Sequence, residues 1–206
     1  MQQRIAMFGG TFNPIHNGHI ALAEAAAKAA DARVLLIPTY LPPHKSDDGL
    51  IGGRHRLAMC RLAAAAYPFL SVSDMELQRG GNSYTVDTLL ALKERYPDAA
   101  LYLACGGDML VTLWQWRRYE EIIRLAAIIA VERPGTDRAA FEEGIHRVEG
   151  DGGRVLPARM EPVALSSSEI RRRIAAGLPV DGLLPAGVAD YIAAHHLYQG
   201  KGADGE

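Results

Sequence analysis

The chain has 206 residues, of which 49% are hydrophobic, and its formal net charge is −2. This length and apolar content suit one compact domain with a full core. The nearly balanced charge argues against a nucleic-acid footprint over the whole surface, so an anionic ligand must be held by local positive groups.

Short apolar runs alternate with segments of helical periodicity. In chain order we predict a strand at 4–8, a helix at 18–30, a strand at 34–37, a helix at 54–66, a strand at 70–72, a helix at 85–95, a strand at 101–105, a helix at 119–125, strands at 127–131 and 163–165, and helices at 170–176 and 185–197. Residues 74–82 are expected to be irregular or to extend the preceding strand. Residues 133–153 receive no element, and their acidic stretches indicate solvated surface. The alternation predicts the α/β class, with a doubly wound, mostly parallel, Rossmann-like sheet.

We expect a single domain over residues 1–206, with a small helical part at about residues 166–198. Cys60 and Cys105 lie in apolar surroundings without metal-ligand spacing, which favours reduced core thiols. The sequence shows no signal peptide, no lipidation signal and no apolar run long enough to span a bilayer. These observations predict a cytoplasmic protein without a membrane partner.

The segment between the first strand and the first helix carries the strongest functional pattern, GGTFNPIHNGH at residues 9–19. A strand, a glycine turn and a helix start bring backbone N–H groups and the positive end of a helix dipole together, which suits a phosphate. Gly9 and Gly10 allow close approach of the backbone to a ligand, and His16 and His19 fall on one side of the helix start. The pattern lacks the lysine of a Walker loop and the glycine spacing of a dinucleotide fingerprint. The alternative is a turn with two incidental histidines.

Four loops with small or polar residues follow predicted strands. These loops span residues 9–19, 38–45, 106–108 and 166–168. Because ligands bind outside the carboxyl ends of parallel strands, we expect the loops to meet at one site. Lys45 supplies a flexible charge for phosphate, unless it is a solvated loop lysine. Ser166 and Glu169 fit a capping box at the start of the next helix. Ser168 and Arg171 add a hydroxyl and a guanidinium there, unless that helix face is only basic and exposed.

Other residues have both a ligand-binding and a structural interpretation. Asp108 follows a buried strand, where its carboxylate either accepts hydrogen bonds from ribose hydroxyls or caps a helix. Thr85 stands at a helix start, where capping is the simpler explanation. Trp116 offers a flat face to a heteroaromatic ring, although a core tryptophan is the commoner case, and Trp114 need not face the same side.

The pattern at residues 9–19 resembles the H-x-G-H signature of the nucleotidyltransferase superfamily, whose members move a nucleoside monophosphate from ATP or CTP to an acceptor. Further segments make the chain similar to one branch, the bacterial nicotinate-nucleotide adenylyltransferases of NAD biosynthesis. They are residues 42–45, 83–89, 106–108, 116, 133–135, 166–173 and 191–198. Asn13 stands where many members have Asp, and Ser168 stands where Thr is frequent. Residues 136–160 show no match.

The resemblance implies transfer of AMP from ATP to nicotinate mononucleotide, which gives deamido-NAD and pyrophosphate. The mononucleotide phosphate attacks the α-phosphorus in line, so catalysis reduces to positioning and charge stabilisation. Mg²⁺ would accompany ATP, held largely by phosphates and water, without a protein metal site. The implied partners are ATP and nicotinate mononucleotide, with no nucleic acid, and the oligomeric state is open between a monomer and a homo-oligomer.

The resemblance also assigns residues to roles. The implied catalytic residues are His16, His19, Lys45 and Arg171. ATP binding is implied for Gly9, Gly10, Thr11, Phe12, His16, His19, Gly106, Asp108, Ser168 and Arg171. Binding of nicotinate mononucleotide is implied for His44, Lys45, Ser83, Tyr84, Thr85, Trp116 and Arg133. The two histidines would donate to the ATP phosphates, and Lys45 and Arg171 would neutralise pyrophosphate or the acceptor phosphate.

Three alternatives stay open. The first is an adenylyltransferase of the same superfamily that acts on phosphopantetheine, which would leave residues 83–89 and Trp116 unexplained. The second is a nucleotide-sensing module without turnover. The third is a metalloprotein that uses His16 and His19, for which the sequence offers no evident third ligand.

Overall fold

A computed structural model describes residues 2–41, 49–132, 135–161, 163 and 165–199. These residues form a sheet of six strands in the order β3-β2-β1-β4-β5-β6, and neighbouring strands pair in parallel. The strands are β1 (Arg4–Gly10), β2 (Arg33–Pro38), β3 (Leu70–Val72), β4 (Ala100–Gly106), β5 (Ala127–Glu132) and β6 (Val155–Arg159). The chain winds outward from β1 in one direction and from β4 in the other. The carboxyl ends of β1 and β4 therefore mark the switch point at which ligands bind in such sheets.

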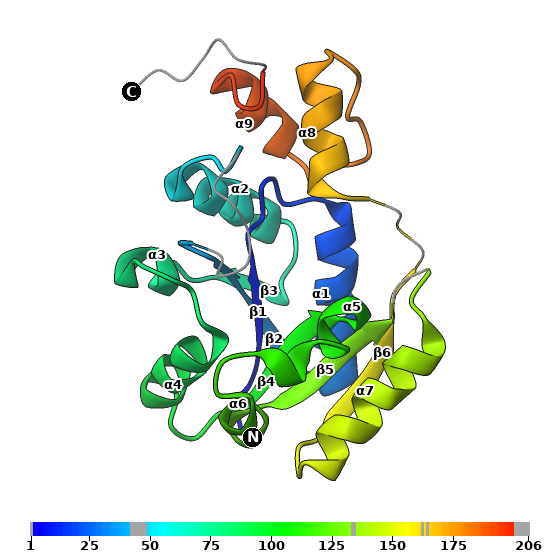
Figure 1. Ribbon diagram of the computed structural model, residues 1–206. Coiled ribbons are helices and arrows are strands. Elements are labelled where there is room, and N and C mark those ends of the chain that lie inside the picture. The colour runs from blue at the N-terminus through cyan, green and yellow to red at the C-terminus, as the bar shows by residue number, and fades with distance from the viewer. Residues whose placement is uncertain (1, 42–48, 133–134, 162, 164, 200–206) are drawn as a thin grey trace.

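Helices cover both faces of the sheet (Figure 1). They are α1 (Asn17–Ala30), α2 (Gly53–Ala65), α3 (Met75–Arg79), α4 (Thr85–Arg95), α5 (Gly107–Leu110), the 3-10 helix η1 (Leu113–Gln115), α6 (Tyr119–Leu125), α7 (Arg138–Gly150), α8 (Ser167–Ala175) and α9 (Val188–Ala194). Strand residues alternate between two apolar cores, as β1 shows: Ala6 and Phe8 pack with α1 and α2, whereas Ile5 and Met7 pack with α4 and α6. The helices α8 and α9 join the first core at the top of the molecule in Figure 1.

The predicted α/β class and doubly wound parallel sheet are confirmed. The strand predicted at 70–72 and the helices predicted at 85–95 and 119–125 have the observed bounds. The helix predicted at 185–197 is shorter, because α9 spans Val188–Ala194. No helix in the described part of the chain is long and apolar enough to cross a bilayer.

Three predictions about elements are wrong. Residues 74–82 contain the helix α3, which is too short for a periodicity signal and is held by tertiary contacts. Residues 133–153 contain the helix α7, which begins where the Asp137 side chain accepts hydrogen bonds from the N–H groups of residues 139 and 140. The last strand among the described residues is β6, and the described residues 163 and 165 lie outside any strand. Pro157 is tolerated in β6 because this strand lies at the sheet edge.

The start of α4 is tied to α3 by a buried polar cluster. Glu76 is 2% exposed, and its Oε1 accepts a hydrogen bond of 2.6 Å from the hydroxyl of Thr88. Arg79 Nη2 donates to the same hydroxyl over 3.0 Å. Burial raises the pKa of Glu76, while hydrogen bonds from Thr88 and Ser83 and the charge of Arg79 oppose that rise. The cluster positions the segment from Ser83 onward at the edge of the sheet.

The raised pKa of Glu76 predicts how stability depends on pH. The folded protein binds the Glu76 proton more tightly than the unfolded chain, whose carboxyl has the ordinary pKa of 4.5, so the free energy of unfolding falls as pH rises above 4.5. Glu76→Gln keeps an acceptor for Thr88 without the charge. We expect its thermal midpoint to match the wild type near pH 4.5 and to exceed it by a few degrees at about pH 8.

Thermal unfolding followed by circular dichroism over this pH range measures the difference. Glu94→Gln, at an exposed position of α4, is the matched control and should track the wild type. A Glu76→Gln protein that is less stable at every pH would contradict the assignment.

Candidate active site

The turn between β1 and α1 lies at the carboxyl end of β1, beneath α8 and α9 (Figure 1). It includes a cis bond between Asn13 and Pro14, and Phe12 adopts a φ of 47°. The Phe12 ring is buried and packs edge-on against Phe8 at 5.4 Å and against His19 at 5.1 Å between ring centroids. A Cβ on Gly10 would lie 2.8 Å from that ring, so Gly10 makes room for it. Phe12 can therefore meet a nucleotide through its main chain, while its side chain supports His19.

The two histidines of the motif form a stacked pair at the start of α1. Their ring centroids are 3.7 Å apart, with 28° between the ring planes. His16 is the buried residue that precedes the helix, and its N–H donates to Nδ1 of His19 over 3.2 Å. Because Nδ1 accepts this bond, the proton of a neutral His19 ring resides on Nε2. The backbone thus sets which nitrogen of His19 can donate to a ligand.

Gly18 is explained by the ring of its neighbour. A Cβ at this position would lie 3.0 Å from both Cε1 and Nδ1 of His16, closer than side chains normally approach. The glycine between the two histidines therefore allows the His16 ring to lie against the helix start and to stack on His19.

The start of α8 is held against the same turn. Ser166 caps α8 by accepting from the N–H of Glu169, as the sequence predicts. Ser167 donates to the carbonyl of Pro14 over 3.0 Å. Arg171 donates through Nη1 to the carbonyl of Asn13 over 2.8 Å and through Nη2 to Ser168 Oγ over 3.4 Å. The fold thus brings Arg171 and Ser168 beside the turn that carries the histidines.

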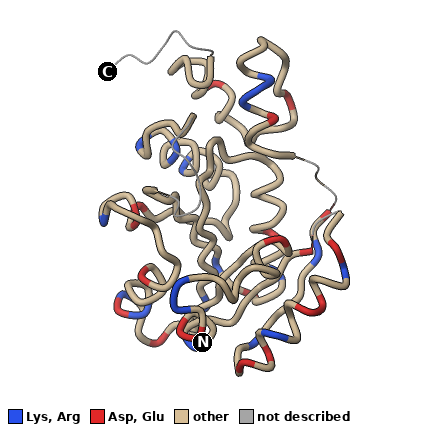
Figure 2. Tube along the Cα trace, in the orientation of Figure 1, with Lys and Arg blue, Asp and Glu red and all other residues tan. Residues whose placement is uncertain are grey.

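The neighbouring arginines of α8 have other partners. Arg172 forms an ion pair of 2.8 Å with Glu169, and Arg173 donates to the carbonyl of Pro179 over 2.8 Å. Arg171 is therefore the arginine that the helix directs toward the turn. Figure 2 shows basic residues on α2 and both charges on α8 at this end of the molecule, and both charges also mix around α6 and α7.

Arg56 on α2 is a site residue that the sequence reasoning missed. Its guanidinium is 1% exposed and donates to the carbonyls of Thr11 over 2.8 Å, Ile51 over 3.1 Å and Tyr40 over 3.4 Å. Burial lowers its pKa. A signal existed, because Arg56 precedes Met59, Cys60 and Ala63 on the buried stripe of α2. The arginine binds the β1–α1 turn to residues on either side of the segment 42–48.

The residues predicted near the ribose lie at the end of β4 and just after it, whereas those predicted near the nicotinate ring lie at the start of α4 and after η1. Gly106 ends β4, and the exposed side chain of Asp108 follows in the first turn of α5, next to β1. Tyr84 rather than Thr85 precedes α4, so the predicted cap at Thr85 is wrong. The Tyr84 ring has the guanidinium of Arg117 4.5 Å above it.

Burial and contacts differ among Ser83, Trp114 and Trp116. Ser83 is buried, and its Oγ accepts from the N–H of Tyr40 over 2.9 Å. Its hydroxyl therefore holds the main chain at Tyr40, just after β2. Trp116 is half-buried against the core that α4 and α6 share. Trp114 is 44% exposed under the guanidinium of Arg147, 4.3 Å from the ring. His44, Lys45 and Arg133 lie outside the described residues, so their roles stay predictions.

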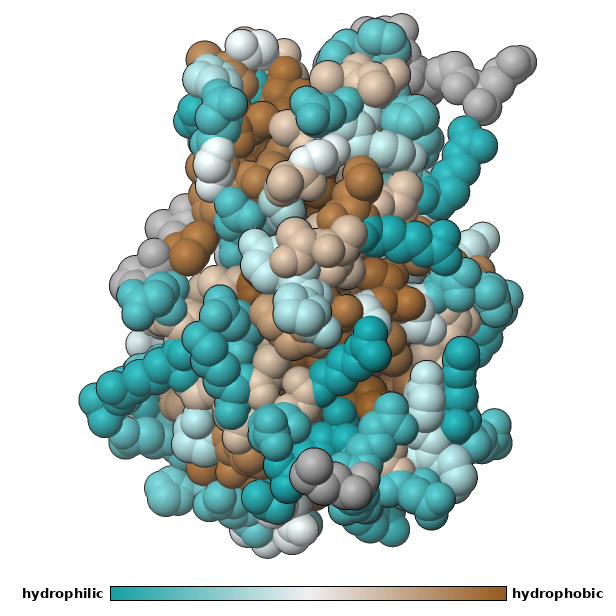
Figure 3. Space-filling view, turned by 180° about the vertical axis from the view of Figure 1, so that it is seen from behind, coloured by the Kyte–Doolittle hydropathy of each residue, from teal (hydrophilic) through white to brown (hydrophobic). Residues whose placement is uncertain are grey.

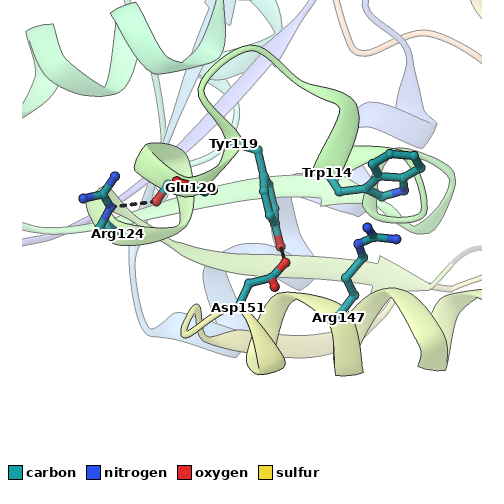
Figure 4. A pocket seen from close by; sticks show the side chains of 6 residues that line it. All are labelled: Trp114, Tyr119, Glu120, Arg124, Arg147 and Asp151. Atoms are coloured by element: carbon teal, nitrogen blue, oxygen red, sulfur yellow. Dashed lines mark hydrogen bonds between the residues drawn. The ribbon is translucent and has the colours of Figure 1, made fainter.

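A pocket of about 460 Å³ opens between α6 and α7 (Figure 4). It is lined by Trp114, Tyr119, Glu120, Arg124, Arg147 and Asp151. The Tyr119 hydroxyl donates to Asp151 over 2.9 Å, and burial together with this carboxylate raises the pKa of Tyr119 to about 12. The helix α6 leads into the amino end of β5, and Asp151 precedes the amino end of β6. The pocket therefore lies toward the edge of the sheet opposite the histidine pair and contains none of the predicted site residues.

Comparisons with known proteins match most of the chain to one family. A family model described as cytidylyltransferase-like matches residues 7–173. The probable nicotinate-nucleotide adenylyltransferase of Carboxydothermus hydrogenoformans is 41% identical over 198 residues, which cover 95% of this chain and 98% of the relative. The protein of the same name from Symbiobacterium thermophilum is 40% identical and covers 95% of each chain.

Solved structures show the same fold. The nicotinic acid mononucleotide adenylyltransferase of Plasmodium falciparum, complexed with NaAD, is similar with a TM-score of 0.77 over 96% of this chain and 98% of that chain. Its sequence is 19% identical, so this likeness concerns the arrangement of the elements.

The contact between Gly18 and His16 generates a prediction. Gly18→Ala forces the His16 ring to move, so we expect the affinity for ATP to fall about tenfold. We expect the thermal midpoint not to fall, because alanine favours the helix by up to about 1 kcal/mol and offsets the ring movement.

Calorimetric titration with ATP and thermal unfolding measure the two effects. Gly150→Ala on α7 is the control, since its Cβ would meet nothing within 4 Å. Unchanged ATP affinity in Gly18→Ala would show that the position of the His16 ring does not matter for the nucleotide.

Proposed function

We propose that this chain, which belongs to the cytidylyltransferase-like family and within it to the nicotinate-nucleotide adenylyltransferases, transfers AMP from ATP to nicotinate mononucleotide. The products are deamido-NAD and pyrophosphate. One observation carries the proposal: the stacked His16–His19 pair stands at the helix start beside β1, with Arg171 held against the same turn. The relatives' names favour nicotinate mononucleotide over phosphopantetheine as acceptor and an enzyme over a sensing module.

The reaction needs no nucleophile from the protein. An oxygen of the mononucleotide phosphate, already anionic, attacks the α-phosphorus of ATP in line. A P–O bond forms as the bond to the leaving pyrophosphate breaks, and the electron pair leaves with pyrophosphate. The chain has then to orient two phosphates and to stabilise the charge that spreads over them.

His16 and His19 act on the ATP phosphates. The N–H of His16 fixes His19 with its proton on Nε2, which makes that nitrogen a preorganised donor to a phosphate oxygen. The positive end of the α1 dipole adds to this field. Gly9, Gly10 and Thr11 supply the main chain that approaches the nucleotide.

Arg171 and Ser168 stabilise the departing pyrophosphate from the start of α8. The guanidinium is anchored at the carbonyl of Asn13, which orients it before substrate binds. In this proposal Lys45 also neutralises the pyrophosphate, and His44 and Arg133 bind the mononucleotide phosphate. These three roles rest on the sequence resemblance.

The two outer parts of the site bind the ribose and the pyridine ring. Asp108 accepts hydrogen bonds from the adenosine ribose, with Gly106 giving close approach. Thr85 at the start of α4 and the half-buried indole of Trp116 hold the nicotinate ring, and Tyr84 borders the same segment.

Mg²⁺ that enters with ATP neutralises phosphate charge when it is bound. Among the described residues no group of three His, Cys, Asp or Glu side chains could hold a metal ion. Cys60 and Cys105 are buried thiols, as a reducing compartment favours, and we propose the cytoplasm as the location. We also propose that the chain can form a homo-oligomer.

Pyrophosphate release tests the function directly. The purified chain with ATP and Mg²⁺ should release pyrophosphate when nicotinate mononucleotide is added, with a higher kcat/KM than with nicotinamide mononucleotide or phosphopantetheine. A preference for phosphopantetheine, or ATP binding without turnover on any acceptor, would overturn the proposal.

Variants of His19 test the donor role. His19→Asn keeps a polar atom near the position of Nδ1 for the N–H of His16 but lacks Nε2. We therefore expect kcat to fall roughly 10²-fold in both His19→Asn and His19→Ala, as on loss of another preorganised donor. Steady-state rates of pyrophosphate release measure this, and a near-normal kcat in His19→Asn would remove Nε2 from the mechanism.

A further inference from the structure

The C-terminal part of the chain reaches the motif through Tyr198. The Tyr198 hydroxyl lies 2.8 Å from Oδ1 of Asn13, across 185 positions of sequence. An amide oxygen only accepts hydrogen bonds, so the tyrosine donates. Asn13 is 6% exposed and belongs to the turn that joins β1 to the histidine pair.

Asn13 joins separate segments of the chain. Its Nδ2 donates to the carbonyl of Gly49 over 2.7 Å, and its main-chain carbonyl accepts the 2.8 Å bond from Arg171. Oδ1 accepts from Tyr198 over 2.8 Å and from the backbone N–H of Ile51 over 3.5 Å. The tyrosine therefore makes the shorter of these two bonds and, together with Gly49, sets the orientation of the amide. An Asp at this position could accept from Tyr198 but could not donate to Gly49.

The position of the Tyr198 hydroxyl is set by the packing of α9. The N–H of Leu197 donates to the carbonyl of Ile192 over 3.0 Å, and both side chains lie in the core that α1 and α2 share. A second tie joins α9 to α2, where the Tyr191 hydroxyl lies 3.0 Å from Nδ1 of His55. Burial raises the pKa of Tyr198, against the opposing charges of Arg171 and Arg56, so the hydroxyl keeps its proton.

We propose that Tyr198 is a positioning residue for adenylyl transfer: its hydroxyl holds Asn13, and the carbonyl of Asn13 holds the Arg171 guanidinium beside the histidine pair. The inference rests on the proposed function. Loss of the hydroxyl leaves Oδ1 with only the 3.5 Å bond from Ile51, which loosens the Asn13 side chain and lets the carbonyl under Arg171 shift. Since that guanidinium serves charge that grows during the reaction, the effect falls on kcat more than on KM.

Two variants that each remove one hydroxyl test the proposal. Tyr198→Phe should lower kcat for pyrophosphate release about tenfold, with KM for ATP within about twofold of the wild type. Tyr191→Phe, the matched control, loses a hydroxyl that bonds His55 on α2 instead of Asn13 in the turn, so its kcat should stay within about twofold. Both thermal midpoints should shift by similar small amounts.

A double-mutant cycle separates positioning from general destabilisation. In an Arg171→Ala background, Tyr198→Phe should cause no further loss of kcat, because its route of action has been removed. Additive losses, or equal losses in Tyr198→Phe and Tyr191→Phe, would overturn the inference and leave the proposed function standing.

The assay of the wild-type chain distinguishes failure of the proposed function from failure of the inference about Tyr198. Absence of turnover with nicotinate mononucleotide in the wild-type chain would overturn the proposed function and this inference with it. If Tyr198→Phe fails to fold, Asn13→Ala removes the same hydrogen bond from its other end, together with the bonds to Gly49 and Ile51, and should lower kcat by at least as much; an unchanged kcat there overturns the inference.

Discussion

The β1–α1 turn is held in place by side chains that donate to its main-chain carbonyls. Within the described residues, Arg56 binds the carbonyl of Thr11 over 2.8 Å, Arg171 that of Asn13 over 2.8 Å, and Ser167 that of Pro14 over 3.0 Å. Buried carbonyls need such partners, and here the partners come from α2 and α8. The turn is therefore stabilised from outside, and its helix start remains directed at a ligand.

This arrangement explains why the catalytic features need the whole chain. The stacked histidines come from one short segment, but the arginine beside them comes from α8, whose Ile170 is buried in the core that also contains residues of α1, α2 and α9. Apolar residues gather in the upper part of the rear face, at the height of α8 and α9 in Figure 1 (Figure 3). The positions of the charged and hydrogen-bonding groups that would face the phosphates thus depend on apolar packing elsewhere in the fold.

Local chemistry made part of the structure predictable. Strand 70–72, the helices at 85–95 and 119–125 and the cap at Ser166 follow from periodicity and capping, which depend on neighbours in sequence. The helix α7 was missed although Phe141, Gly144 and Val148 show helical spacing, because the acidic residues between them suggested solvated surface. The helix α3 offered no comparable signal, since a buried Glu76 holds it through tertiary contacts.

The residues of the candidate site were likewise predictable only where they belong to local sequence features. The residues alone singled out His16 and His19, because glycine turns and helix starts are local features, and the family resemblance added Arg171. The buried stripe of α2 could have indicated that Arg56 is buried, but its role depends on carbonyls in three separate segments. The residues alone could not choose among Arg171, Arg172 and Arg173, since that choice depends on a contact across 158 positions. Lys45 and Arg133 keep the roles that the family resemblance gives them.

A crystal structure of the chain with deamido-NAD tests the central claim most directly. The account predicts the dinucleotide at the carboxyl ends of β1 and β4, with phosphate oxygens within hydrogen-bond distance of His19 Nε2 and of the Arg171 guanidinium. A dinucleotide bound in the pocket between α6 and α7, or phosphates that touch neither residue, would contradict it.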